Sequence, residues 1–147
     1  MKAAVVDDAL DRGAAPSTGR WVELGSGTGA GTRLLHDRGA QQVSVDLSHS
    51  MLVHAPHGLA PKVRADSSLL PFPEDTFDAI LLINMLLFPH EVDRVLRPHG
   101  AVVWVNTRGD QTPIHLPPDD VDRALPGDWT GVASRAGAGQ WAVLRRA

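Results

Sequence analysis

The sequence predicts an α/β fold of the doubly wound type, with helices on both faces of a mainly parallel sheet. Short apolar runs typical of buried strands alternate with helix-like segments along the chain. A glycine-rich turn follows the first strand, and an acidic residue ends the second, as in β-α-β units that bind nucleotides. Right-handed crossovers then bring the carboxyl ends of the parallel strands to one edge of the sheet.

The composition limits the range of functions. The 147 residues suffice for a buried core, and we expect a single domain over residues 1–147 with a short N-terminal helix. The net charge is −3 and no basic run stands out, so nucleic acid is not an expected partner. The chain has no cysteine, which suits a cytoplasmic protein. No apolar run is long enough to span a membrane, and no metal site is expected.

In the first part of the chain, residues 3–12 predict an amphipathic helix because their apolar residues fall on one side. Residues 21–24 and 43–46 predict buried strands. Between these strands, residues 30–38 predict a helix that Gly39 ends.

The middle of the chain continues this alternation. Ser48 predicts the N-cap of another helix, and residues 61–65 predict a third strand. Residues 77–84 are the most apolar run and predict a central strand of a parallel sheet. Because Pro89 blocks an earlier start, the next helix is expected only over residues 90–96.

The last part of the chain predicts a closing hairpin. Residues 97–100 predict a turn, and residues 101–105 predict a fifth strand. A short helix is expected to begin near Pro117. Residues 129–136 and 140–145 alternate loosely around a glycine-rich turn, which predicts two antiparallel strands.

The glycine turn and two aspartates are the main candidates for a ligand site. Gly25, Gly27 and Gly29 allow positive φ and leave backbone N–H groups open at a helix start, which favours negative charge. Asp46 ends the second strand, where a carboxylate can accept from both ribose hydroxyls. Asp66 ends the third strand and can accept from an exocyclic amine. A tight turn with a helix cap, and a turn aspartate at position 66, are the alternatives.

Five further side chains are weaker candidates. Leu47 and Met51 follow the second strand and can press on a flat ring, although core packing is at least equally expected for Met51. His90 is the best candidate for a general base, with a solvated loop histidine as the favoured alternative. Asn84 and Asn106 either orient an acceptor or cap strand ends.

Four stretches, in this order and spacing, resemble the class I S-adenosylmethionine-dependent methyltransferases, and most closely their type 11 group. The stretches are residues 22–29, 45–52, 65–78 and 94–100. The resemblance implies S-adenosylmethionine as cofactor. It also implies a three-layer α/β/α, Rossmann-like fold with a seven-stranded sheet of order 3-2-1-4-5-7-6, in which strand 7 is antiparallel.

The resemblance also implies roles by position. Glu23 and the glycine loop would hold the methionine end of the cofactor, and Asp46 would take the ribose hydroxyls. Asp66 and the backbone N–H of Ser67 would meet the adenine, while Asn84 would lie near the sulfonium. The implied cofactor-binding residues are Glu23, Gly25, Ser26, Gly27, Thr28, Gly29, Asp46, Leu47, Met51, Asp66, Ser67 and Asn84.

We therefore expect transfer of a methyl group from S-adenosylmethionine to a small-molecule acceptor, at oxygen, nitrogen or carbon, by in-line displacement. One alternative is a non-catalytic module that binds S-adenosylmethionine or S-adenosylhomocysteine and needs a partner chain. A less favoured alternative is an NAD-dependent oxidoreductase, whose glycine fingerprint fits loosely. Few residues precede the first strand, so the acceptor site is open, closed by a second subunit of a homodimer, or covered by upstream residues. Asp46→Ala is expected to cripple cofactor binding and leave the fold intact.

Overall fold

The structure is a computed structural model that describes residues 2–27, 29–55, 57–113 and 116–147. Its strands are β1 (Arg20–Leu24), β2 (Gln41–Asp46), β3 (Lys62–Arg64), β4 (Phe77–Ile83), β5 (Leu96–Asn106), β6 (Trp129–Ala136) and β7 (Gly139–Arg146). Its helices are α1 (Lys2–Arg12), α2 (Ala30–Asp37), α3 (His49–His54), α4 (Pro89–Val95), α5 (Pro118–Ala124) and the 3₁₀ turn η1 (Gly109–Gln111).

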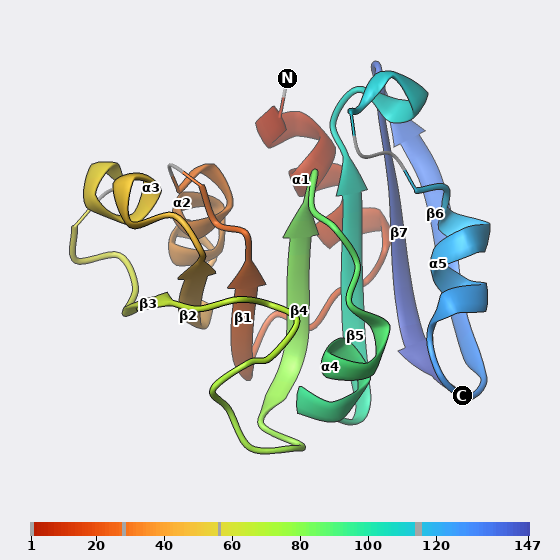
Figure 1. Ribbon diagram of the computed structural model, residues 1–147. Helices are drawn as coiled ribbons and strands as arrows, with labels where there is room; N and C mark the ends of the chain where they lie inside the picture. The colour runs from red at the N-terminus through yellow and green to blue at the C-terminus, as the bar shows by residue number, and fades with distance from the viewer. Residues whose placement is uncertain (1, 28, 56, 114–115) are drawn as a thin grey trace.

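The strands form a seven-stranded sheet of order β3-β2-β1-β4-β5-β7-β6 (Figure 1). β1 to β5 run parallel, whereas β7 is antiparallel to both β5 and β6. This confirms the expected Rossmann-like order. The long apolar strands β4 and β5 lie at the centre because both of their faces are buried.

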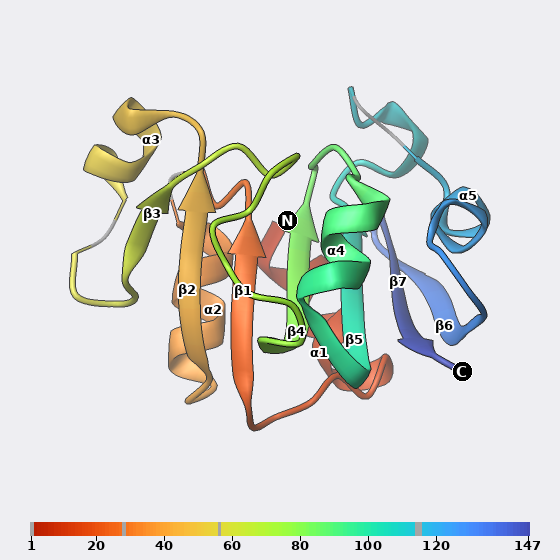
Figure 2. The same ribbon diagram turned by 60° about the horizontal axis from the view of Figure 1, so that its bottom comes forward.

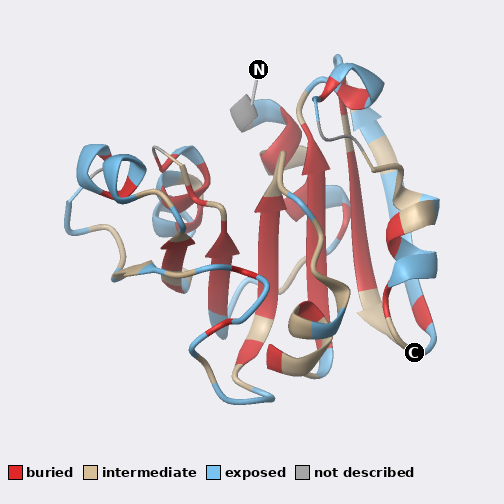
Figure 3. Ribbon diagram, viewed as in Figure 1, coloured by how far each residue is buried: buried red, intermediate tan, exposed pale blue. Residues whose placement is uncertain are grey.

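Helices cover both faces of the sheet (Figure 2). On one face, Val6 of α1 and Leu35 of α2 pack against the core that contains Trp141. On the other face, Val92 of α4 and Val121 of α5 belong to a second core cluster. The strands β1, β4, β5 and β7 between these layers are the most buried part of the molecule (Figure 3). Among the described helices, none is long and apolar enough to cross a membrane.

Most predicted elements are found close to their expected bounds. Ser48 caps α3 by accepting a hydrogen bond from the backbone N–H of Met51 at 3.3 Å. The closing hairpin is also confirmed. Ala136 pairs with Gly139, so only two residues form its turn, and Gly137 takes the positive φ of 58° that this turn requires.

The turn predicted over residues 97–100 is wrong, because this stretch belongs to β5. Leu96 pairs with the start of β4, and regular pairing resumes at Ala101 after a shift in register. His99 adopts a φ of 64° within this irregularity. Arg97 fixes the stretch by donating to the carboxylate of Asp78 at 2.9 Å. Only Asp78 separates the two paired positions of β4, so the four residues 97–100 bulge out between the paired positions of β5.

Candidate functional site

Asp46 and Asp66 lie at the same edge of the sheet. Asp46 ends β2, and the parallel pairing of β2 with β3 places it beside Arg64. Asp66 follows Arg64 by two residues. The glycine loop follows the end of neighbouring β1, so all three features meet at the carboxyl edge of the parallel strands (Figure 1).

The glycine loop is fastened to β2 by two backbone donors. The N–H of Ser26 donates to the carbonyl of Val45 at 3.0 Å, and the N–H of Gly27 donates to Asp46 Oδ2 at 2.7 Å. The φ angles of Gly25 and Gly27 are 68° and 56°, a region that L side chains rarely adopt. A Cβ built on Gly27 meets nothing within 4 Å, so a ligand has room to approach this backbone.

The buried carboxylate of Glu23 forms the floor beneath this loop. Its Oε1 accepts from Thr32 Oγ1 at 2.7 Å, and that hydroxyl lies 2.9 Å from Ser44 Oγ. A Cβ at Gly31 would lie 2.2 Å from Glu23 Oε2, so any larger residue there would displace the Glu23 carboxylate. The sequence analysis missed Gly31, Thr32 and Ser44; a glycine inside a helix was the available signal for the first.

A hollow with an empty volume of ≈ 340 Å³ opens above Glu23. Ser26 lines it and is only 6% exposed, yet its Oγ has no hydrogen-bond partner in the described part of the chain. Buried polar groups nearly always have partners, so this hydroxyl fits a polar ligand. The hollow is lined by Glu23, Gly25, Ser26, Gly27, Ala30, Gly31 and Ile83.

The donor and acceptor set of this hollow fits S-adenosylmethionine. Backbone N–H groups at the start of α2, together with the Ser26 hydroxyl, suit the carboxylate and amine of a methionine moiety. Asp46 keeps acceptor capacity for ribose hydroxyls, because a carboxylate has about four lone-pair positions. Thr28, one of the expected cofactor residues, lies outside the described residues.

The two aspartates differ in how far they are engaged. Asp46 also accepts from the backbone N–H of Ser48 at 2.8 Å, so each of its oxygens holds a backbone group. Asp66 is exposed, and its Oδ1 accepts from the N–H and the Oγ of Ser68 at 2.9 and 2.8 Å. These two bonds lower the pKa of Asp66. Asp66 is therefore a turn aspartate in the free protein, as the alternative stated, and neighbouring Ser67 is buried.

Two apolar side chains beside Asp46 are exposed. Leu47 is 62% exposed and Met51 is 44% exposed, so neither packs in the core. Exposed apolar side chains at the carboxyl edge of a parallel sheet are suited to contact with the face of a ring. The contact expected of both side chains with an adenine stays a prediction.

Asn84 joins the ends of β4 and β5. Its Nδ2 donates to Thr107 Oγ1 at 2.7 Å, and its Oδ1 accepts from the N–H of Thr107 at 2.9 Å. Asn84 has a φ of 51°, and the side chain that follows, Met85, lies against Gly25. Both polar atoms of the Asn84 side chain are thus engaged with Thr107, which positions the loop beside the glycine turn.

Asn106 and His90 occupy different surroundings. Asn106 is buried and donates through Nδ2 to the carbonyl of Leu116 at 3.1 Å, while its Oδ1 has no partner among the described residues. His90 is exposed near the start of α4, where it lines a second hollow together with Ser68 and Phe88. The structure therefore does not bring His90 into the hollow beneath the glycine loop.

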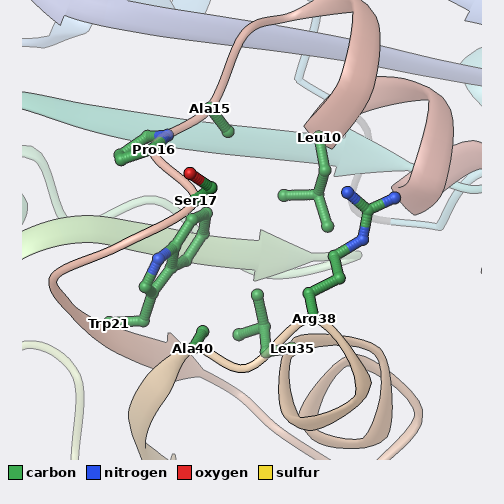
Figure 4. A pocket seen from close by; sticks show the side chains of 8 residues that line it. All are labelled: Leu10, Ala15, Pro16, Ser17, Trp21, Leu35, Arg38 and Ala40. Atoms are coloured by element: carbon green, nitrogen blue, oxygen red, sulfur yellow. The ribbon is translucent and has the colours of Figure 1, made fainter.

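A further hollow lies at the other end of β1 (Figure 4). It contains Trp21, near the beginning of the strand whose far end carries the glycine loop. Its lining is mostly apolar, and Arg38 at its side is held by Asp7 at 2.7 Å and Asp11 at 2.8 Å. This hollow therefore lies away from the glycine loop and from both aspartates.

A family model described as a methyltransferase domain matches residues 22–104. The chain belongs to the class I S-adenosylmethionine-dependent methyltransferase family. The chain is 37% identical over 88 residues to a demethylmenaquinone methyltransferase of Corynebacterium urealyticum, covering 55% of this chain and 38% of that protein. The chain thus spans less than half the length of that relative.

Two solved structures share the methyltransferase fold. A protein from Pyrococcus horikoshii is 17% identical with a TM-score of 0.78, over 97% of this chain and 87% of that one. An S-adenosylmethionine-dependent methyltransferase from Mesorhizobium loti is 19% identical with a TM-score of 0.71, over 92% of this chain and 95% of that one. At these identities the likeness establishes the fold, and S-adenosylmethionine is the cofactor that the family uses.

Proposed function

We propose that this chain transfers the methyl group of S-adenosylmethionine to a small apolar acceptor that carries a ring. The observation that carries the proposal is the Gly27–Asp46 bond at 2.7 Å beside the unpartnered hydroxyl of Ser26. This places a glycine turn, an unpartnered buried hydroxyl and a carboxylate with remaining acceptor capacity side by side, as an adenosine-containing ligand requires.

The surface near the site supports an apolar acceptor. Leu86 follows β4 and is 54% exposed, and Leu69 follows β3 and is 77% exposed. Both lie on loops at the carboxyl edge of the sheet, where the cofactor residues gather. The curated relatives are named demethylmenaquinone methyltransferases. Together these observations favour a quinone-like ring over a charged acceptor.

When bound, S-adenosylmethionine supplies an electrophilic methyl group on a sulfonium. The chain's own residues would bind and orient it: Asp46 would take the ribose hydroxyls, while the Ser26 hydroxyl and the N–H groups at the start of α2 would take the methionine moiety. In-line displacement then depends on holding the acceptor atom about 3 Å from the methyl carbon and on excluding water. His90 stays a candidate base for an acceptor that must lose a proton.

A non-catalytic binding module is the second candidate function, and one observation favours it. The side chain of Asn84 is engaged by Thr107, and His90 opens onto a different hollow. Neither is therefore aimed at the hollow of Glu23, so a partner chain would have to complete an acceptor site.

Calorimetry with S-adenosylhomocysteine and with NAD tests the cofactor. We expect binding of the former only, and tight NAD binding alone would overturn the proposal. Transfer of a labelled methyl group to demethylmenaquinone then tests turnover. His90→Gln, compared with the exposed His36→Gln as a control, tests the base: a lower kcat with unchanged cofactor affinity supports it. Binding without transfer to any ring acceptor would favour the module.

A further inference from the structure

The outer edge of β6 is an unpaired strand edge. β6 is the last strand of the sheet, eight residues long, and its register with β7 has no shift. Because Ala136 and Gly139 flank a two-residue turn, they form a hydrogen-bonded pair, and bonded and non-bonded pairs alternate from there. The backbone N–H and C=O groups that point away from β7 belong to Trp129, Gly131, Ala133 and Arg135.

These outward groups have no hydrogen-bond partner in the described ranges of the chain. Natural edge strands are usually protected by proline, lysine, a bulge or a short length. β6 has none of these, its only charged residue is Arg135, and Val132 is 50% exposed in its middle. Such an edge favours pairing with another strand.

We propose that β6 pairs antiparallel with β6 of a second copy of this chain, which makes one continuous sheet across a homodimer. A two-fold axis makes the same edge meet itself, so the edge must be self-complementary. The short, nearly uncharged sequence of β6 meets this condition, whereas a strand with several like charges would not.

The backbone directions fix the register of this pairing. Residues with outward groups must face one another to form hydrogen-bonded pairs. When Val132 faces its own copy, Gly131 faces Ala133 and Arg135 faces Trp129, which gives about eight backbone hydrogen bonds. No like charges then lie opposite each other. A shift by one pair would place Val132 opposite Ser134 or Thr130, so that the apolar pair of two valines is lost in either direction.

This interface is distinct from the cofactor site. β6 lies at the end of the sheet opposite β3, and the residues expected to hold the cofactor follow β1, β2 and β3 (Figure 1). The dimer therefore leaves that edge open and differs from a dimer that closes the acceptor side. The proposal does not depend on the proposed function.

A single introduced cysteine tests both the interface and its register, because the chain has no cysteine of its own. Opposed residues of a non-hydrogen-bonded pair have Cα atoms about 4.5 Å apart, within the range of a disulfide. Under mild oxidation Val132→Cys is expected to form a disulfide-linked dimer. Ala133→Cys, which faces Gly131, is the matched control and should stay mostly unlinked. No link at 132, or a stronger link at 133, overturns the proposed register.

Light scattering after gel filtration tests the association itself. The unmodified chain is expected at about twice its 15.7 kDa mass. Val132→Lys should give a monomer because two lysines would face each other, whereas Thr130→Lys adds the same charge opposite Ser134 and should keep the dimer. Circular dichroism checks that each variant is folded. A wild-type monomer across the whole dilution series, or equal dissociation of the two lysine variants, overturns the proposal.

Discussion

Asp46→Ala is expected to weaken both the fold and the cofactor site. The carboxylate accepts from Gly27 N at 2.7 Å and from Ser48 N at 2.8 Å. Hydrogen bonds to a charged group contribute about 1.5–3 kcal/mol each. Asp46 is only partly buried, so in the variant water can bond to the two N–H groups and offset part of the loss. We therefore expect the free energy of unfolding to fall by about 2–3 kcal/mol. The sequence alone predicted an intact fold for this variant; the two backbone bonds change that prediction.

Urea unfolding followed by tryptophan fluorescence, with and without S-adenosylhomocysteine, measures both effects. A ligand at one hundred times its Kd raises the stability of the native state by about 2.7 kcal/mol. The wild type and the exposed-residue control Asp122→Ala should show this gain, and Asp46→Ala should lose most of it. A variant within about 0.5 kcal/mol of the wild type that keeps the full ligand effect would refute the reasoning.

Three further substitutions follow from single side chains. Ser26→Ala removes a buried hydroxyl that has no partner among the described residues. The free energy of unfolding, measured by thermal unfolding, should stay the same or rise by up to about 1 kcal/mol, while the affinity for S-adenosylhomocysteine should fall in calorimetry. A less stable variant with unchanged affinity would contradict the site. His99→Gly relieves a φ of 64° and should stabilise the fold by about 1 kcal/mol, and a less stable variant would count against this account of β5. The guanidinium of Arg94, which donates to the Glu91 carboxylate at 2.6 Å, holds the pKa of Glu91 below its usual 4.5. Because the folded pKa is depressed, this stabilisation is present above pH 4.5 and is lost as the pH falls through the folded pKa. The unfolding free energy of Glu91→Gln should thus depend less on pH in acid than that of the wild type, and parallel profiles would be inconsistent with this pair.

The central strands of the fold could be predicted because each of them is a continuous apolar run in the sequence. Residues 77–84 could only be a strand buried on both faces, and the glycine turn could only join a strand to a helix. The stretch 97–100 was mispredicted because its proline and glycine suggest a turn locally. Its path depends on the pairing of β4 with the residues on either side of it and on the ion pair of Arg97 with Asp78, which are contacts distant in sequence.

Residues of the candidate site could be predicted from the sequence where the backbone geometry at their position requires one type of residue. Gly27 and Asp46 belong to that class, since the turn needs glycine and the strand end needs an acceptor. The Asn84–Thr107 pair was not, because its two residues lie 23 positions apart and meet only when β4 and β5 align. Gly31 was missed for a similar reason: its necessity comes from the Glu23 carboxylate packed against it.

The bond between Gly27 and Asp46 has a kinetic consequence. Gly27 and Asp46 are already held together before any ligand arrives, so little conformational entropy is lost at these two residues when the nucleoside docks. Association should then resemble that of rigid pockets, with no slow isomerisation phase in stopped-flow traces. The amide of Gly27 should likewise exchange slowly with deuterium in the ligand-free protein, since it is tied to a carboxylate that β2 holds in place.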